Sequence, residues 1–269
     1  MSWNVFWIFA LVSVLLWLAG SLCALYGRKR LSEILVFAGL LVFAAFIAGF
    51  WASLGRPPLR TSGETRLWYS FFMMLSALLT YMRWGYRWIP AFSLVVASVF
   101  ICLNIFKPEI HDESLMPALQ SWWFMPHVTV YMFSYSVLGC AFIMACAGLF
   151  RGSDIFLEPS DTLVYIGTAF LSLGMLSGAL WAKQAWGNYW NWDPKETWAA
   201  VTWCIYLIYI HLRLSGKTGR RRTKWLYIVL IAGFAGLQMC WWGVNLLPSA
   251  RERQHVYAVG NNVEYNQLN

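Results

Sequence analysis

Eight apolar runs of about twenty residues each, separated by short polar breaks, dominate this sequence. An α-helix needs about that many apolar residues to cross the hydrocarbon core of a bilayer. The runs lie at 3–26, 31–54, 67–83, 88–106, 122–150, 161–182, 195–214 and 225–247. They predict an all-α, polytopic membrane helix bundle of about eight transmembrane helices. We expect residues 1–269 to form a single integral membrane domain.

Composition and charge agree with a membrane protein. Hydrophobic residues make up 59% of the chain and charged residues only 12%, whereas about a quarter of the residues of soluble domains are charged. The formal net charge of +8 is attributed to cytoplasmic loops and anionic lipid headgroups. Membrane lipid is therefore an expected partner and nucleic acid is not. The first apolar run is followed by "GRKR", the reverse of a cleavable signal peptide, and is interpreted as a retained span.

Positive charge orients the predicted bundle. Lys and Arg follow the first, third, fifth and seventh runs, and the loop "GKTGRRRTK" (216–224) is the most basic. Such loops remain on the cytoplasmic side, so both termini are expected on the outer, periplasmic face. Arg56, Arg60 and Arg66 depart from this pattern, because they fall near an outer loop.

The stretch "WGNYWNWDPKETW" (186–198) lies between the sixth and seventh runs, on the predicted outer face. Asp193, Pro194 and Glu196 have the spacing of a capped helix start. If residues 183–192 are helical, Trp186 and Trp190 share a face at i, i+4. Tryptophans can form an interfacial belt, but their density here and the charges among them favour a shelf for a large flat ligand.

The chain has only four histidines. His127 and His255 are expected on the outer face, where two neutral imidazoles beside an aromatic shelf would suit axial ligation of haem iron. His211 lies seventeen residues after Pro194, which is roughly 26 Å along a helix. It is therefore placed near the cytoplasmic end, either as a second functional site or as a snorkelling residue. His111, among acidic neighbours, is predicted to be a solvated loop residue.

Three segments resemble one protein family. "WAKQAWGNYWNWDPKETWAAVTWCIYLIYIHLR" (181–213) is similar to the tryptophan-rich WWD segment of CcsA/ResC-type cytochrome c biogenesis proteins. "WWFMPHVTVYMFSY" (122–135) and "WWGVNLLPSARERQHVYAVG" (241–260) match as well. The resemblance covers residues 120–260, which would be a WWD haem-handling core. The setting "ARERQHVY" departs from the "GLHSY"-like setting of the family's last histidine.

The resemblance implies a set of haem contacts. His127 and His255 would ligate the iron of haem b on the outer face, and His211 would hold haem within the membrane. The axial ligand opposite His211 would come from a CcsB/ResB-type partner. Trp186, Trp190 and Trp192 would wall the macrocycle. Asp193 and Glu196 would each be either a haem contact or a helix cap. Lys183, Lys195, Arg251 and Arg253 are alternatives for the propionate contacts.

The resemblance also implies a function. Haem would pass to the outer face and be presented to an apocytochrome c, whose C-x-x-C-H cysteines become attached to it. The chain would be the membrane subunit of a system II haem-attachment (holocytochrome c synthase) complex, with thiol-reducing proteins as further candidate partners. The expected site is a bacterial inner membrane, or a thylakoid membrane if the source is a plastid.

Two other functions remain open from the sequence. One is a haem-delivery chaperone that takes no part in attachment, and the other is a small-molecule membrane transporter with aromatic gates. All six cysteines fall within predicted spans, and the chain contains no C-x-x-C motif. Thiol–disulfide exchange by this chain is therefore not expected.

Overall fold

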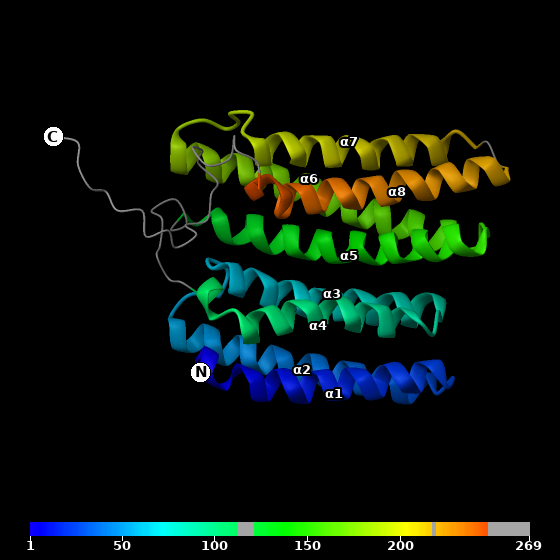
Figure 1. Cartoon of the computed structure of the whole chain (residues 1–269). Helices are drawn as coiled ribbons and strands as arrows, with labels where there is room; N and C mark the ends of the chain where they lie inside the picture. Colours follow the sequence, from blue (N-terminus) through cyan, green and yellow to red (C-terminus); the bar gives the residue numbers. More distant parts are fainter. Residues whose placement is uncertain (112–120, 217–218, 247–269) are drawn as a thin grey trace.

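The computed structural model describes residues 1–111, 121–216 and 219–246, and these are almost entirely helical (Figure 1). The elements in chain order are α1 (Trp3–Leu25), α2 (Lys29–Leu54), α3 (Ser62–Trp84), α4 (Ile89–Phe106), η1 (Pro108–His111), α5 (Phe124–Arg151), α6 (Leu157–Trp186), α7 (Pro194–Leu214), α8 (Arg220–Trp241) and η3 (Gly243–Leu246). The α-helices run up and down side by side. The predicted all-α helix bundle is confirmed.

Within the described residues, seven helices are long and apolar enough to cross a membrane, and α3 is the exception. α3 packs against α2, α4 and α5, and most of its residues are buried, including Glu64, Thr65 and Arg66. A helix enclosed by other helices can carry polar side chains because they do not face lipid. The low hydropathy of α3 therefore reflects its central place in the bundle.

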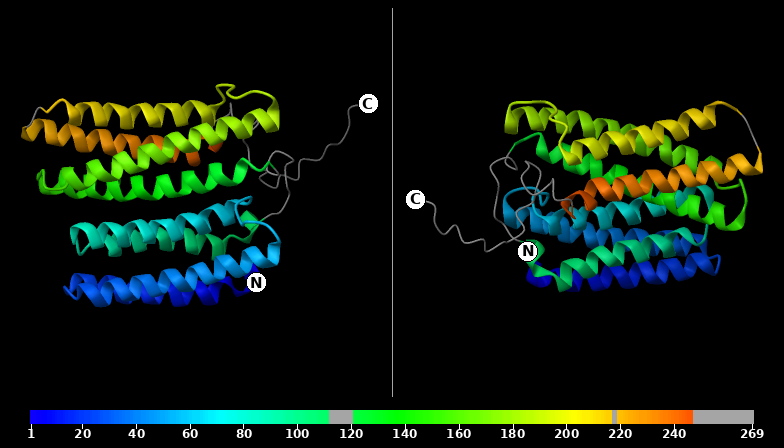
Figure 2. Two further views of the ribbon diagram at one scale, coloured as in Figure 1. Left: turned by 180° about the vertical axis from the view of Figure 1, so that it is seen from behind. Right: turned by 45° about the horizontal axis from the view of Figure 1, so that its top comes forward.

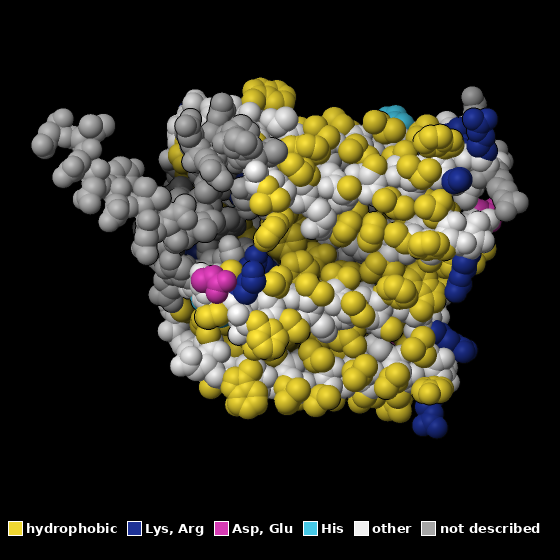
Figure 3. Space-filling view, viewed as in Figure 1, with side chains coloured by type: hydrophobic (Ala, Val, Ile, Leu, Met, Phe, Trp, Pro, Cys, Tyr) yellow, Lys and Arg dark blue, Asp and Glu magenta, His cyan; other side chains and the backbone are white. Residues whose placement is uncertain are grey.

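The two ends of the bundle differ in charge. The connections α1–α2, α3–α4, α5–α6 and α7–α8 lie at one end, where Lys and Arg side chains gather beside a broad hydrophobic surface (Figures 1 and 3). We call this the basic end. The N-terminus, the α2–α3 and α6–α7 connections and the start of α5 lie at the opposite end (Figure 1), which we call the distal end.

Two hydrophobic clusters hold the helices together. Trp17, Phe43 and Phe46 are fully buried in the cluster of α1–α4. The second cluster lies mainly among α3 and α5–α8 and includes Leu138 and Tyr206. α3 contributes to both, and Figure 2 shows α3–α5 between the α1–α2 pair and α6–α7. Because lipid is as apolar as the bundle interior, close packing rather than removal from water stabilises these contacts within the bilayer.

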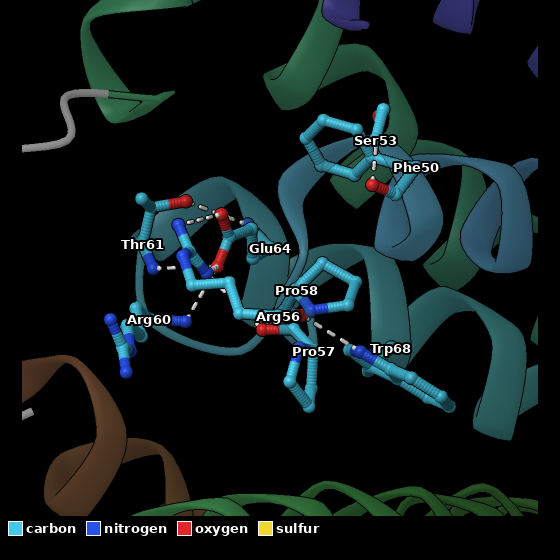
Figure 4. Close-up of polar contacts among 9 residues, drawn as sticks. All are labelled: Phe50, Ser53, Arg56, Pro57, Pro58, Arg60, Thr61, Glu64 and Trp68. Carbon is cyan, nitrogen blue, oxygen red and sulfur yellow. Dashed lines mark hydrogen bonds and ion pairs between the residues drawn. The ribbon is translucent and has the colours of Figure 1, made fainter. Parts of the chain in front are cut away.

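The structure explains in part the arginines near the α2–α3 connection. Both terminal nitrogens of Arg56 lie 3.0 Å from the carboxylate oxygens of Glu64, which is buried (Figure 4). Glu64 also closes a capping box with Thr61, the N-cap of α3. Arg60 donates its backbone N–H to the same carboxylate at 2.6 Å. Arg56 is therefore neutralised by a bidentate ion pair.

The prediction for His111 was wrong. Its ring stacks on Trp3, with centroids 3.8 Å apart and planes 2° from parallel. A Cβ on Gly63 would lie 2.5 Å from the His111 ring, so His111 also packs closely on the start of α3. The acidic neighbours in sequence suggested solvent, whereas residues from α1 and α3 enclose the ring.

Candidate functional site

His127 lies in the first turn of α5, at the distal end of the bundle. Its Nδ1 atom lies 2.8 Å from the carbonyl oxygen of Gly174 on α6. A carbonyl oxygen only accepts hydrogen bonds, so Nδ1 is the donor, and in the neutral ring Nε2 carries the lone pair. Metal-binding histidines commonly have this tautomer, held by a hydrogen bond from the other ring nitrogen. The contact with Gly174 therefore leaves Nε2 as the nitrogen through which a neutral His127 could bind a metal.

Two further features of α6 position His127, and sequence reasoning missed both. Trp181 is buried and stacks on the imidazole, with centroids 5.4 Å apart and planes 26° apart. A Cβ on Gly178 would lie only 2.6 Å from Cε1 of His127. Gly174 and Gly178 form a G-x-x-x-G pattern, which permits close helix approach in membranes. That pattern was the available signal in the sequence.

The connection between α6 and α7 is not helical. α6 ends at Trp186, and Gly187 follows in the left-handed conformation with φ of 83°. The i, i+4 face expected for Trp186 and Trp190 is therefore absent. Trp186 instead meets Trp181 edge-on at 4.7 Å. Trp190 and Trp192 form a separate T-shaped pair at 5.8 Å.

Trp190 and Trp192 differ in their exposure to solvent. Trp192 is 68% exposed and adopts a φ of 55°, which is unusual for a residue other than glycine. The indole nitrogen of Trp190 is buried and has no hydrogen-bond partner among the described residues. Buried donors are normally satisfied, so this N–H is a candidate donor to a bound ligand.

The predicted start of the seventh span is confirmed. Asp193 is the N-cap of α7 and accepts a hydrogen bond from the Glu196 N–H at 2.8 Å. The Glu196 carboxylate accepts from the N–H groups of Asp193, at 3.3 Å, and Asn191, at 2.7 Å. Asp193 and Glu196 thus fix where α7 begins and hold the preceding loop against it. The haem contact expected of Asp193 stays a prediction.

His211 lies near the opposite end of α7, three residues before Leu214. Its side chain is exposed on the outside of the bundle. Nδ1 lies 2.7 Å from the carbonyl oxygen of Leu207, so Nδ1 is the donor here too, and in the neutral ring Nε2 carries the lone pair. The structure therefore separates His211 from His127, as the helix length predicted.

Comparison with known proteins decides the family. The model of the cytochrome C assembly protein family matches residues 2–250. The chain is 30% identical to the cytochrome c biogenesis protein CcsA of Synechococcus sp. (strain RCC307), over 82% of this chain and 83% of that one. It is 29% identical to the protein of that name from Solanum lycopersicum, over 91% of each chain. The chain belongs to the cytochrome c assembly protein family.

The family match extends the resemblance found in the sequence. Residues 120–260 carried that resemblance, whereas the family model covers nearly the whole chain, including α1–α4. A third relative, the CcsA protein of Chlamydomonas reinhardtii, is 38% identical over 62% of this chain and 49% of its own length. The expected CcsA-type identity is confirmed.

The remaining expected haem contacts are the second outer histidine and the propionate candidates. His255, Arg251 and Arg253 lie outside the described residues. Lys183 donates to the carbonyl oxygen of Gly187 at 2.7 Å and lies over the Tyr189 ring. Lys183 thus closes the end of α6, and the choice among the propionate candidates stays a prediction.

The cysteines agree with the sequence analysis. All six are free. Cys140 and Cys240 are buried in the bundle, where Cys240 donates to the carbonyl oxygen of Lys195 at 3.4 Å. They behave as small packing residues in the interior.

Proposed function

We propose that this membrane protein acts in cytochrome c biogenesis by carrying haem b to the outer face and presenting it to apocytochrome c. The cysteines of a C-x-x-C-H motif would then be joined to the haem. The chain would work with a CcsB/ResB-type partner as a holocytochrome c synthase complex, and thiol-reducing proteins would keep the apocytochrome cysteines reduced. Family membership and relatives named cytochrome c biogenesis proteins support this proposal.

The proposed topology has eight spans with both termini outside. α3 would be the eighth span, shielded from lipid by α2, α4 and α5. The charge of the basic end supports its placement in the cytoplasm, or the equivalent compartment of a plastid (Figure 3). Relatives from Synechococcus and Chlamydomonas fit a bacterial inner membrane or a thylakoid membrane. Residues 1–269 would form one integral membrane domain with residues 120–260 as its haem-handling core.

The arrangement of His127 carries the proposal for the outer site. Its proton is on Nδ1 and its ring is held by Gly174 and Trp181, so Nε2 is preset as an axial ligand to haem iron. His255 would supply the opposite ligand. The buried N–H of Trp190 would donate to an oxygen of the haem, and Trp186 and Trp192 would wall the macrocycle. The protein would contribute mainly proximity and orientation.

His211 would provide a second haem site near the basic end. His211 faces outward on α7, and His111 and His127 lie at the other end of the bundle, so the opposite ligand would come from another chain, here the CcsB/ResB-type partner. Haem made in the cytoplasm would meet this site before the outer one.

The test uses the full chain co-expressed with its partner and a c-type apocytochrome. We expect a Soret band in the purified complex and covalent haem on the apocytochrome. His127→Gly should abolish attachment, and added imidazole should partly restore it by filling the ligand gap. His111→Gly is the control. It also removes an imidazole at the distal end, but one that packs on α1 and α3, and it should retain haem.

Two outcomes would favour the alternatives. Haem binding without any effect of this chain on covalent attachment would indicate a haem-delivery chaperone. A purified complex without a Soret band would indicate a transporter and would overturn the proposal.

A further inference from the structure

A polar cluster joins α6 to α7 at the basic end. The side chain of Arg213 donates to both carboxylate oxygens of Asp161, with Nε 2.7 Å from Oδ1 and Nη2 2.5 Å from Oδ2. The hydroxyl of Tyr209 donates to Oδ1 of the same carboxylate at 2.7 Å. Asp161 lies on α6, whereas Tyr209 and Arg213 lie on α7. One carboxylate therefore holds two residues of α7, one helical turn apart.

His211 lies between these two residues in the sequence and on the opposite side of the helix. Each residue advances an α-helix by about 100°. Measured around the helix axis from Tyr209, Arg213 therefore lies at about 40° and His211 at about 200°. Burial agrees, because Tyr209 is fully buried and His211 is exposed. Fixing Tyr209 and Arg213 to α6 therefore turns His211 away from α6.

The hydrogen bond of His211 also fixes the direction of its Nε2 atom relative to α7. Its Nδ1 is held by the carbonyl oxygen of Leu207, one turn earlier on the same helix. The ring therefore follows the backbone of α7, and the direction of Nε2 depends on how α7 is rotated about its own axis.

Apolar packing restrains α7 mainly on its α8 side, because α7 packs more extensively on α8 than on α6. α7 is the least buried of the seven candidate spans, with 22% of its most apolar window buried. Further from the basic end, Trp203 donates to Ser172 on α6 at 2.8 Å, which anchors the middle of α7. Near His211, the carboxylate of Asp161 links α6 to α7 by accepting hydrogen bonds from Tyr209 and Arg213. Partly buried bidentate ion pairs have defined geometry, so this cluster can set the rotation.

We infer that Asp161, Tyr209 and Arg213 are positioning residues for His211, which keep its Nε2 directed outward toward a ligand shared with a second chain. This inference rests on the proposed function. Asp161, Tyr209 and Arg213 would act through the orientation of α7 and not as haem ligands.

The test compares Asp161→Asn with Asp154→Asn in the complex with its partner. Both substitutions remove one negative charge near the same end of α6, but Asp154 is exposed and makes no ion pair among the described residues. Outer-shell substitutions typically weaken metal binding by about 10- to 100-fold. We expect Asp161→Asn to lower haem affinity at the inner site by at least about tenfold on that scale, and Asp154→Asn to leave it unchanged. Added imidazole should partly restore haem in Asp161→Asn, which it would not do for a misfolded protein.

Two further measurements separate positioning from general stability. Cys204 is exposed and lies seven residues before His211, so it shares the face of His211. Its maleimide labelling in detergent, resolved by mass spectrometry, should fall in Asp161→Asn if α7 rotates. The charge exchange D161R/R213D should recover labelling and haem toward wild-type values.

The outcomes distinguish the inference from the proposed function. If His211→Ala retains wild-type inner haem, the proposed inner site is wrong. If His211→Ala loses inner haem while Asp161→Asn keeps wild-type haem and Cys204 labelling, the site stands and the positioning role is overturned.

Discussion

The Nδ1 atom of His127 lies 2.8 Å from the carbonyl oxygen of Gly174, a residue 47 positions later in the chain and on the next helix. This contact fixes the tautomer of the imidazole and ties the start of α5 to the middle of α6. His211 reaches the same tautomer through the carbonyl oxygen of Leu207 on its own helix. Both histidines thus hold Nδ1 against a backbone carbonyl although they lie at opposite ends of the bundle.

The close approach of α5 and α6 should be sensitive to a single methyl group. In Gly178→Ala, the new Cβ would lie 2.6 Å from Cε1 of His127, so the imidazole or the helix must move. Because axial ligation depends on orientation, we expect outer-site haem affinity to fall by about 10- to 100-fold. Haem titration of the complex measures this. Leu176→Ala, on the exposed face of α6, is the control, and equal affinities for the two variants would contradict the assignment.

The loop tryptophans make a second prediction. Trp190→Ala removes a buried indole donor, and Trp192→Ala removes a largely exposed ring. We expect both to lower outer-site haem while membrane insertion stays normal, because the spans are untouched. Trp190→Ala should have the larger effect, since only it loses the donor. Haem content per purified complex is the measurement. Wild-type haem content and maturation in both variants would identify the pair as an interfacial anchor.

Features that depend on residues close together in the chain, such as helix positions and a helix cap, could be predicted from the sequence. The cap formed by Asp193 and Glu196 is encoded within four residues, and the apolar runs define the helices to within about six residues of the observed ends. The prediction failed where distant residues meet. Trp181 became a partner of His127 only through the packing of α5 on α6, and His111 is enclosed by Trp3 and Gly63 from two other helices. Sequence spacing contains no direct record of such contacts.

The Arg56–Glu64 pair should matter for stability. The Arg56 and Glu64 side chains are 17% and 2% exposed, so Arg56→Ala leaves a buried carboxylate without its cation. Breaking a buried pair from one side costs about 3–5 kcal/mol, and the backbone N–H groups that still contact Glu64 place the expected loss near the lower limit. Arg60→Ala is the matched control, because it retains the hydrogen bond from the backbone N–H of residue 60 to Glu64. Unfolding in detergent should separate the two variants, and equal stabilities would contradict the structural role of the pair.

The stack of His111 on Trp3 should weaken in acid. Burial lowers the pKa of His111 below its usual value of 6.5; Arg66 also lowers it, whereas Glu64 and Glu109 oppose the shift. The unfolded chain therefore takes up a proton at higher pH than the folded chain does. The stability due to neutral His111 is fully present above pH 6.5 and is lost as the pH falls from there through the lower, folded pKa. We expect the thermal unfolding midpoint to fall more steeply with acidification in the wild type than in His111→Asn. Parallel pH profiles would count against this prediction.

The last prediction concerns the order of the two haem sites. His211 lies near the basic end and His127 at the distal end, so haem supplied from the basic end reaches His211 first. His211→Ala should therefore deplete haem at both sites, whereas His127→Gly should spare the inner pool. Loss of the partner should resemble His211→Ala, because each removes one axial ligand of the same haem. Haem stoichiometry per complex, measured for both single variants with the partner present, distinguishes these cases. Normal outer loading in His211→Ala, or equal depletion of both sites in both variants, would exclude passage of haem from His211 to His127.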